Sequence, residues 1–301
     1  MKIENLTDLQ VLVHTARSGS LTGAAAVLGM TPAAASATLK RLEAQLGTRL
    51  FERSTRAMRI TPQGQILLDY ANRAFELLAE GESQASADRA ALVGTLRVAA
   101  PSDLARTTLL PWFSEFLQHN PGVHLTLSVS DRPLDVLRDE VDLAIRYGPL
   151  PDSRLVARTL AQAKPVLSAS PDYLRRHPAP QTPQDLLQHN CLTFDRSGRR
   201  HRLWRFAQKG QWTEVRVNGD RSVDDASLVR EWAVAGAGVL FKSAIDQRHE
   251  LASGALVPML TDWDTEPYPL HALLPSGRFI PTRVRALVDF LAVKFDALAT
   301  V

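Results

Sequence analysis

The sequence has a single cysteine, Cys191, among its 301 residues. One thiol excludes an internal disulfide and is typical of a reducing compartment, so we predict a cytoplasmic protein. Long apolar runs are also missing, since none approaches the ~20 residues that a membrane-spanning helix needs. The chain starts on an amphipathic helical pattern and shows no signal peptide. We therefore expect neither membrane insertion nor export.

Signatures of catalysis and of metal binding are scarce. There is no Gly-x-Ser-x-Gly motif, and the eight histidines show no paired ligand spacing. The glycine-rich run at 235–238 ends a helical pattern instead of following a strand, which argues against a phosphate-binding loop. Cys191 lies in an apolar stretch, which favours a buried inert thiol over a redox switch. We predict that the protein is not an enzyme and uses neither metal nor cofactor.

The charge is small but unevenly placed. Hydrophobic residues make up 45% and charged residues 22%, which indicates a globular chain. Residues 1–62 carry eight basic and four acidic side chains, which gives this segment a net charge of +4. The whole chain has a net charge of +3, so the remaining residues together carry −1. A basic N-terminal segment suits contact with phosphates, although a merely solvated basic face is the alternative.

The stretch from Ser20 to Glu43 has the pattern of a helix-turn-helix. Gly29 supplies the positive φ that a tight turn needs, and Thr31 with Pro32 starts a second helix. Ala35, Leu39 and Leu42 recur at helical spacing, so the opposite face is left for a DNA major groove. The alternative at this point is an ordinary helical hairpin inside a core.

The residues that follow favour DNA binding. Thr48 to Pro62 predicts two short strands around a basic turn, then a capped helix. With this wing the chain resembles the LysR-type transcriptional regulators, whose N-terminal signature SGSLTGAAAVLGMTPAAASATLKRLEAQLGTRLFERSTRAMRITPQG matches nearly without gaps. The later residues resemble the family's CrgA-like branch, so the likeness covers almost the whole chain.

The resemblance implies three parts. Residues 1–62 are expected to form an all-α winged helix-turn-helix domain and residues 63–92 a dimerising linker helix. The linker pattern places Leu67, Tyr70, Phe75 and Leu78 on one stripe, which would pair with a second subunit or else pack on its own domain.

Residues 93–301 alternate strand and helix patterns, which predicts an α/β architecture with parallel sheets. The resemblance implies an effector-binding domain of two α/β lobes, similar to periplasmic binding proteins. Lobe I would hold residues 93–163 and 268–301 and lobe II residues 164–267, with crossings near Ala163 and Tyr268. Expected elements in lobe I include a helix at 109–117 and a short helix at 134–137, and a helix at 224–235 is expected in lobe II.

Candidate DNA-binding residues lie on the two helices and the wing. The family often has Gln-Pro before its central Ser and Arg after it; here Ser36 matches, whereas Pro32, Ala33 and Ala37 occupy the other positions. Direct base reading should be sparse, with apolar contacts to thymine methyls and basic contacts to phosphates. The candidates are Ser20, Thr22, Thr31, Pro32, Ala33, Ser36, Ala37, Lys40, Arg53 and Arg56.

Candidate effector-binding residues follow the ends of predicted strands, because ligands of two-lobed α/β domains bind there. They are Ser102, Ser130, Arg146, Ser168, Thr193, Phe194 and Asp224. A helix start at Ser102 and the charge of Arg146 would suit a carboxylate effector. Alternatives are a plain helix cap for Ser102 or Asp224, and a salt bridge from Arg146 to an acid such as Asp131.

The sequence therefore predicts a LysR-type regulator that binds promoter DNA, self-associates as a dimer or tetramer, and responds to a small-molecule effector between its lobes. An effector-independent architectural DNA-binding protein is the main alternative. A small-molecule-binding protein without a regulatory role is another, and a solute-binding transport protein would share only the fold of residues 95–301.

Overall fold

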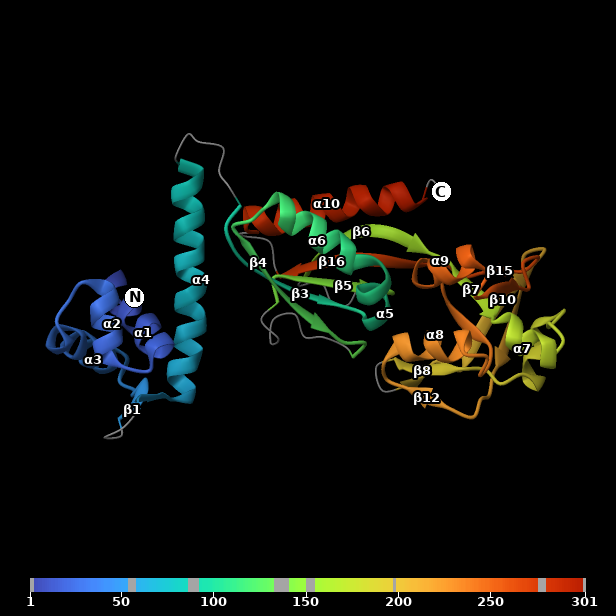
Figure 1. Ribbon diagram of the computed structural model, residues 1–301, viewed down its shortest axis with the longest axis horizontal. Helices are drawn as coiled ribbons and strands as arrows, with labels where there is room; N and C mark the ends of the chain where they lie inside the picture. The colour runs from blue at the N-terminus through green and yellow to red at the C-terminus, as the bar shows by residue number, and fades with distance from the viewer. Residues whose placement is uncertain are drawn as a thin grey trace. The chain divides into compact units, whose positions relative to one another are not determined.

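The computed structural model describes residues 3–53, 58–85, 92–132, 141–149, 155–196, 199–275 and 280–299. The chain divides into two compact units, Met1–Ala90 and Ala91–Val301, each recognisable in Figure 1. Among the helices of the described residues, none is both long enough and apolar enough to cross a membrane.

The first unit is a three-helix domain with a two-stranded wing and a long final helix. Its elements are α1 (Leu6–Ser18), α2 (Leu21–Leu28), α3 (Pro32–Leu46), β1 (Phe51–Arg53), β2 (Met58–Ile60) and α4 (Pro62–Ala85). Leu12, Leu39 and Leu42 are fully buried where α1 and α3 meet. The strands pair antiparallel, with Phe51 opposite Ile60, so the predicted wing is present.

Side-chain caps fix the starts of the first three helices. The side chains of Asn5, Ser20 and Thr31 accept hydrogen bonds from backbone N–H groups two or three residues on. Each such cap pairs a donor that the helix itself leaves unpaired. Gly29 ends α2 at φ 64°, as the turn requires.

Asp8 lies in the first turn of α1. A carboxylate at this position can accept from the free N–H groups of the helix start, as its sequence position suggests. Instead Asp8 is buried and forms an ion pair with Arg41 of α3, which also donates from Nε at 3.3 Å. Asp8 therefore pairs with Arg41 of another helix instead of with the N–H groups of its own helix start. The ion pair uses Arg41 to join α1 to α3.

The stripe of α4 is divided between two environments. Leu67, Ala71 and Phe75 pack against the core of their own domain, as the alternative interpretation required. Tyr70 and Leu78 are 62% and 45% exposed, so part of the stripe is left uncovered by this unit.

The second unit begins with lobe I, by which we mean its described residues up to Ala163 and from Tyr268 onward. The lobe is built on a five-stranded sheet in the order β4-β3-β5-β16-β6. Its elements are β3 (Gly94–Ala100), α5 (Ser102–Leu104), the π-helix η1 (Ala105–Leu109), α6 (Leu110–His119), β4 (Val123–Val129), β5 (Leu143–Tyr147), β6 (Leu155–Ala163), β16 (Tyr268–Pro275) and α10 (Thr282–Ala299).

Two helices cover one face of this sheet (Figure 1). Trp112 of α6 and Phe295 of α10 meet edge to face at 4.9 Å between ring centroids. Leu143, Leu270 and Leu291 are fully buried in the same core. The hydrophobic core of lobe I therefore lies between the sheet and α6 with α10.

The expected parallel sheet is only partly correct. Strands β4 and β5 run parallel to β3, but β16 runs antiparallel to both β5 and β6. The chain leaves the sheet after Ala163 in β6 and returns at Tyr268 in β16, and these two residues are paired. An outgoing and a returning strand side by side must be antiparallel, which the sequence pattern alone did not show.

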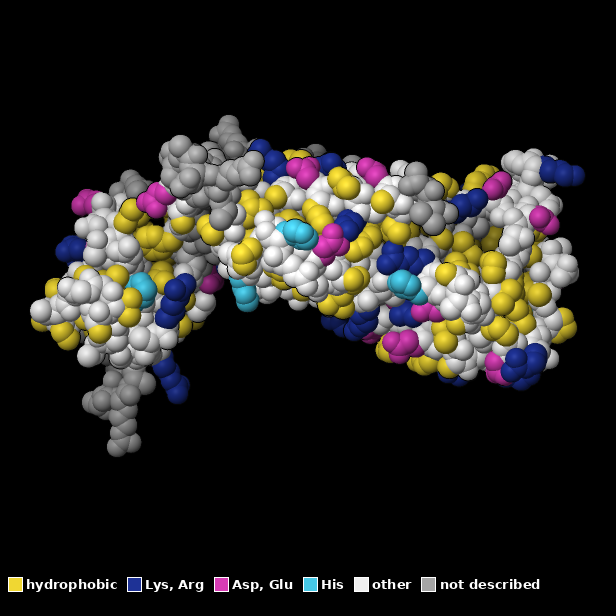
Figure 2. All heavy atoms as spheres, turned by 45° about the horizontal axis from the view of Figure 1, so that its top comes forward, with side chains coloured by type: hydrophobic (Ala, Val, Ile, Leu, Met, Phe, Trp, Pro, Cys, Tyr) yellow, Lys and Arg dark blue, Asp and Glu magenta, His cyan; other side chains and the backbone are white. Residues whose placement is uncertain are grey.

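Lobe II, by which we mean the described residues from Lys164 to Pro267, contains three small sheets in the orders β13-β7-β14, β12-β8-β9 and β11-β10-β15. Its elements are β7 (Pro165–Ala169), α7 (Pro171–Arg176), the 3-10 helix η2 (Pro183–Gln188), β8 (Thr193–Arg196), β9 (Arg199–Arg200), β10 (Leu203–Gln208), β11 (Gln211–Arg216), β12 (Ser222–Val223), α8 (Ala226–Val234), β13 (Leu240–Ser243), α9 (Ala244–Ser253), β14 (Val257–Met259) and β15 (Asp264–Thr265). Trp204, Phe206 and Phe241 pack together in its core. Hydrophobic side chains are also numerous on its surface, at the right of Figure 2.

Local differences from the prediction have identifiable causes. Strand β6 was missed because it is an edge strand in which only Leu160 and Ala163 are buried, so no alternation is visible. The helix expected at 109–117 starts earlier, at Ser102, and passes through a π-helical turn. Asp225 caps α8 rather than Asp224. The helix expected at 134–137 lies outside the described residues.

Two glycines of α4 allow a matched test of packing. A Cβ on Gly64 would lie 2.1 Å from the backbone oxygen of Leu50, whereas a Cβ on Gly81 would meet nothing within 4 Å. We expect Gly64→Ala to lower the Tm because backbone atoms must move. Gly81→Ala should raise stability by up to ~1 kcal/mol through helix propensity. Thermal unfolding by circular dichroism measures both, and equal effects would contradict the tight contact at Gly64.

Candidate functional site

Helix α3 presents an exposed face made mostly of small side chains. Its buried residues, among them Ala35 and Leu39, point into the domain core. On the other side Thr31, Pro32, Ala33, Ala37 and Lys40 are exposed and Ser36 is half-buried, as in the predicted DNA-binding set. Small side chains on this face let a second surface approach the helix backbone closely.

The remaining candidates for DNA contact lie near helix starts and in the wing. Ser20 is half-buried and caps α2, and Thr22 in the first turn of α2 is exposed. The Ser20 hydroxyl oxygen accepts a bond from the backbone N–H of Gly23, which leaves its hydrogen free to donate. Arg53 is the last residue of β1. Arg56 lies outside the described residues.

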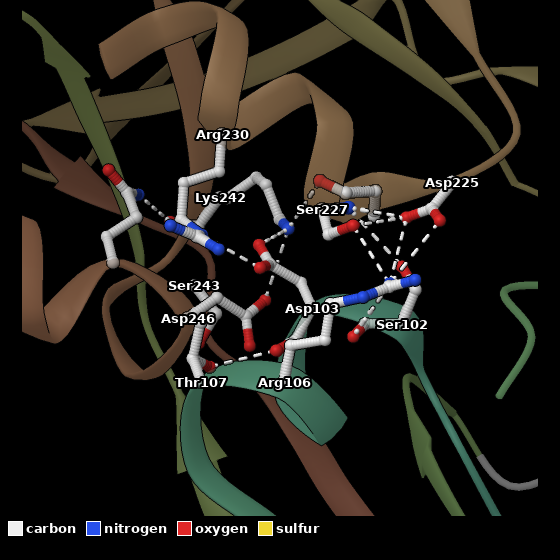
Figure 3. Close-up of polar contacts among 12 residues, drawn as sticks. Ser102, Asp103, Arg106, Thr107, Asp225, Ser227, Arg230, Lys242, Ser243 and Asp246 are labelled. Atoms are coloured by element: carbon white, nitrogen blue, oxygen red, sulfur yellow. Dashed lines mark hydrogen bonds and ion pairs between the residues drawn. The ribbon is translucent and has the colours of Figure 1, made fainter.

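A buried ionic network joins the two lobes of the second unit (Figure 3). Asp103 of lobe I, 1% exposed, binds Lys242 of β13 and accepts from Arg230 Nε of α8 at 2.8 Å. Lys242 Nζ also donates to the Ala226 carbonyl at 3.1 Å and lies 3.6 Å from Asp246. Charges taken out of water are tolerated only when paired in this way, so Asp103 helps to hold the lobes in the arrangement of this structure.

Two further polar contacts cross between the lobes. Tyr147 of β5 donates its hydroxyl hydrogen to Asp246 of α9 at 2.8 Å. Arg106, beside Asp103 in Figure 3, donates to the Ser227 hydroxyl at 2.9 Å. Both contacts supplement the Asp103 link.

The Asp131 carboxylate forms another link between the lobes, at the start of two helices. It accepts from the Ser102 N–H at 3.0 Å and from the Ala226 N–H of lobe II at 2.7 Å, and it binds the Ser102 hydroxyl. The N–H group at Ser102 that we expected to receive an anionic effector therefore already has a carboxylate partner. Ser102 is not a plain cap, because it is the first residue of α5 and Pro101 holds the cap position. Its hydroxyl accepts from the Ser227 N–H across the lobes at 3.3 Å.

An interlobe cavity of about 80 Å³ adjoins these contacts. It is lined by Pro101, Asp103, Asp131, Arg146, Tyr147, Phe194, Ala226, Lys242, Asp246 and Tyr268. Both lobes contribute to the lining, and the charged groups come from both. A change in the distance between the lobes must change the shape of this cavity.

Of the predicted effector residues, Arg146 and Phe194 line the cavity. Arg146 donates to the Ser130 carbonyl at 3.0 Å. Ser130, Thr193, Ser168 and Asp224 are not among the described lining residues. Ser168 is fully buried against Gln247, and Asp224 is 60% exposed and pairs with Arg132 at the surface.

Comparison with known proteins agrees with this architecture. The family model of the bacterial regulatory helix-turn-helix protein, lysR family, matches residues 6–65, and the LysR substrate binding domain matches residues 89–296. The HTH-type transcriptional activator TtdR of Escherichia coli (strain K12) is 30% identical over 288 residues, covering 95% of this chain and 92% of TtdR.

CrgA, an HTH-type transcriptional regulator of Neisseria meningitidis, is 30% identical over 288 residues, with 95% of this chain and 96% of CrgA covered. The solved structure of CrgA, a LysR-type transcriptional regulator, superposes with a TM-score of 0.64 and 29% identity and covers 97% of this chain and 99% of that one. The chain belongs to the LysR family of transcriptional regulators. The resemblance to its CrgA-like branch is likewise confirmed.

In this LysR-family regulator, the carboxyl group of Asp246 has an unusually high pKa. Burial raises its pKa to about 6 from an ordinary 3.8; the Lys242 ammonium opposes the rise and the Asp103 charge adds to it. Burial also raises the pKa of the Tyr147 phenol, which faces Asp246. Cys191 is buried and its pKa is raised to about 12 by burial, which agrees with an inert thiol.

Sequence reasoning missed the central members of the network. Lys242 could have been noticed, because it is a charge that directly follows the apolar run Val239–Phe241, a signal similar to the one that identified Arg146. Asp103, Arg230 and Asp246 lie on helices whose sequences resemble ordinary solvent-facing turns. Only the tertiary structure brings them together.

Asp246 gives the domain a testable pH dependence. A raised pKa means that the native state binds this proton more tightly than the unfolded chain, so the group's contribution to stability falls as the pH rises from about 4 to about 6. Asp246→Asn removes the titrating group and with it this loss of stability. We therefore expect the Tm of the variant, relative to that of wild type, to rise as the pH increases from about 4 to about 6.

Thermal unfolding at a series of pH values measures this difference. Asp224→Asn, which changes an exposed carboxylate of the same lobe, is the matched control and should leave the profile unchanged. A constant difference between Asp246→Asn and wild type would contradict the raised pKa.

Proposed function

We propose that this LysR-family regulator binds promoter DNA through α3 and the wing, and that a small effector in the interlobe cavity controls this binding. The observation that carries the proposal is the cavity lined from both lobes, beside ion pairs that join them. An effector that favours one lobe spacing over another shifts the population of the two arrangements. Nothing in this scheme requires a reaction, so we propose a non-enzymatic, cytoplasmic protein.

The proposed DNA contact relies on phosphates more than on bases. On the exposed face of α3, Lys40 carries the positive charge, while Ala33 and Ala37 suit thymine methyl groups. We assign Ser36 to base or phosphate contact and Ser20, Thr22 and Thr31 to hydroxyl contacts with the backbone. Arg53 and Arg56 of the wing are assigned to phosphates or to a narrow minor groove.

The proposed self-association uses the uncovered part of α4. Ile66, Tyr70, Leu77 and Leu78 are each at least 44% exposed on this helix. Apolar side chains at this spacing favour pairing with the same helix of a second subunit, which gives a dimer or a tetramer.

The DNA contact is tested by salt dependence. We expect Lys40→Gln and Arg53→Ala to weaken binding to all duplexes and to lower the slope of log K against log salt concentration by about 0.9 per lost phosphate contact. Lys40→Arg keeps the charge and serves as the control. Fluorescence anisotropy with a promoter fragment and a scrambled duplex measures the slopes, and unchanged slopes would contradict these contacts.

The proposed effector is a carboxylate that binds Arg146, the predicted residue that brings a cation into the cavity. Phe194 would contact its apolar part, and Ser102 would become available only where Asp131 moves. Ser130, Ser168, Thr193 and Asp224 are not among the described lining residues, and we assign them no contact with the effector. The cavity of about 80 Å³ admits a small group, so a larger effector requires the lobes to separate.

A matched set of carboxylates and their neutral amides tests this assignment. A carboxylate at 100 times its Kd should add about 2.7 kcal/mol of stability, or roughly 5–10 °C in Tm for a domain of this size, whereas its amide should not. Arg146→Ala should abolish that shift and the effector-dependent change in DNA binding. Arg158→Ala, a change at an exposed arginine paired with Asp289, is the control. A full response of Arg146→Ala would exclude Arg146 from the site.

A further inference from the structure

A second, larger cavity opens beside the strands that connect the lobes. We call it the hinge groove, and its volume is about 470 Å³, within the usual range for small-molecule sites. It is lined by Pro149, Pro165, Phe194, His201, Leu203, Arg205, Phe241, Lys242, Glu266, Pro267, Tyr268 and Pro269. It lies in the second unit, mostly on lobe II, whose apolar surface is visible in Figure 2.

The walls of the hinge groove suit a flat apolar group. Phe194, Phe241 and Tyr268 contribute aromatic side chains, and His201 is stacked on Phe194 at 6.1 Å between ring centroids. Four prolines stiffen the backbone around them. Rigid aromatic walls favour a planar ring, since aromatic groups gain from stacked or edge-on contact in addition to burial.

The polar groups of the hinge groove favour a positive charge. Arg205 is paired with Glu214 at 3.0 Å and with Glu266 at 2.6 Å, so two carboxylates face one guanidinium. Lys242 is likewise held between two acids, Asp103, which Arg230 shares, and Asp246. Both basic side chains of the lining are thus compensated, and the Glu266 side chain is still 55% exposed.

We propose that the hinge groove is a second small-molecule site, which binds a planar aromatic ring carrying a cationic amine. The ring lies among Phe194, Phe241 and Tyr268, and the ammonium group is directed to Glu266. This ligand class is opposite in charge to the carboxylate proposed for the interlobe cavity. The proposal depends neither on that effector nor on DNA binding.

Three probes with one ring system separate shape from charge. Isothermal titration calorimetry of the full chain is performed with tryptamine, indole and indole-3-acetate. We expect tryptamine to bind at least about tenfold more tightly than indole-3-acetate, with neutral indole between them, because cation–π contacts and a carboxylate favour the amine.

Two pairs of variants locate the binding without changing residues shared with the interlobe cavity. Leu203→Arg places bulk and positive charge in the groove and should abolish tryptamine binding. Leu187→Arg changes another exposed leucine of the same lobe, outside the lining, and should not; the two leucines are 48% and 56% exposed. Glu266→Gln should bring the affinity for tryptamine close to that for indole, whereas Glu231→Gln on α8 should leave the preference unchanged.

Thermal unfolding shows that each variant is folded, and Glu266→Gln provides an independent result if Leu203→Arg is not. The proposal is overturned if tryptamine shows no saturable binding, if indole-3-acetate binds more tightly than tryptamine, or if a folded Leu203→Arg variant keeps its affinity. A preference for tryptamine that survives Glu266→Gln would equally overturn the assignment of the ammonium group.

Discussion

The second unit depends on one buried carboxylate that neutralises two cations of the opposite lobe. Asp103 is 1% exposed and binds both Lys242 and Arg230. Removing such a partner leaves a cation in a medium of low dielectric constant, which costs far more than an exposed ion pair contributes. The lobes therefore cannot separate gradually at this point, because the cations must gain another partner or reach water. A contact of this kind favours two discrete arrangements, as an effector-controlled regulator requires.

The connecting strands explain how such a contact can be made and broken without unfolding either lobe. β6 and β16 carry the chain out of lobe I and back, and their pairing ends at Ala163 and Tyr268. Each lobe has a main core of its own, between the sheet and α6 with α10 in lobe I and around Phe241 in lobe II. Rotation about the strands thus changes interlobe contacts such as Tyr147 to Asp246 while both cores stay packed.

Features set by neighbouring residues could be predicted from the sequence. Thr31 caps its helix as expected, Gly29 adopts the positive φ of the turn, and the wing pairs in an antiparallel manner, because each depends on residues a few positions apart. Long-range partners could not be predicted in this way. Asp8 prefers Arg41 of another helix to its own helix start, and Asp103 is 139 positions from Lys242. The mixed direction of the main sheet likewise follows from where the chain returns, which no local pattern encodes.

Asp131 ties the chemistry of the effector to the spacing of the lobes. Its carboxylate occupies the N–H groups of Ser102 in lobe I and Ala226 in lobe II, two donors that an external carboxylate would otherwise use. An anion that binds Ser102 must first displace Asp131, and the displacement breaks an interlobe contact. The affinity of such an anion then includes the free energy of separating the lobes. A ligand that reaches only Arg146 and a ligand that also reaches Ser102 therefore stabilise different lobe spacings. If the effector is the carboxylate proposed above, its size therefore decides which arrangement it favours.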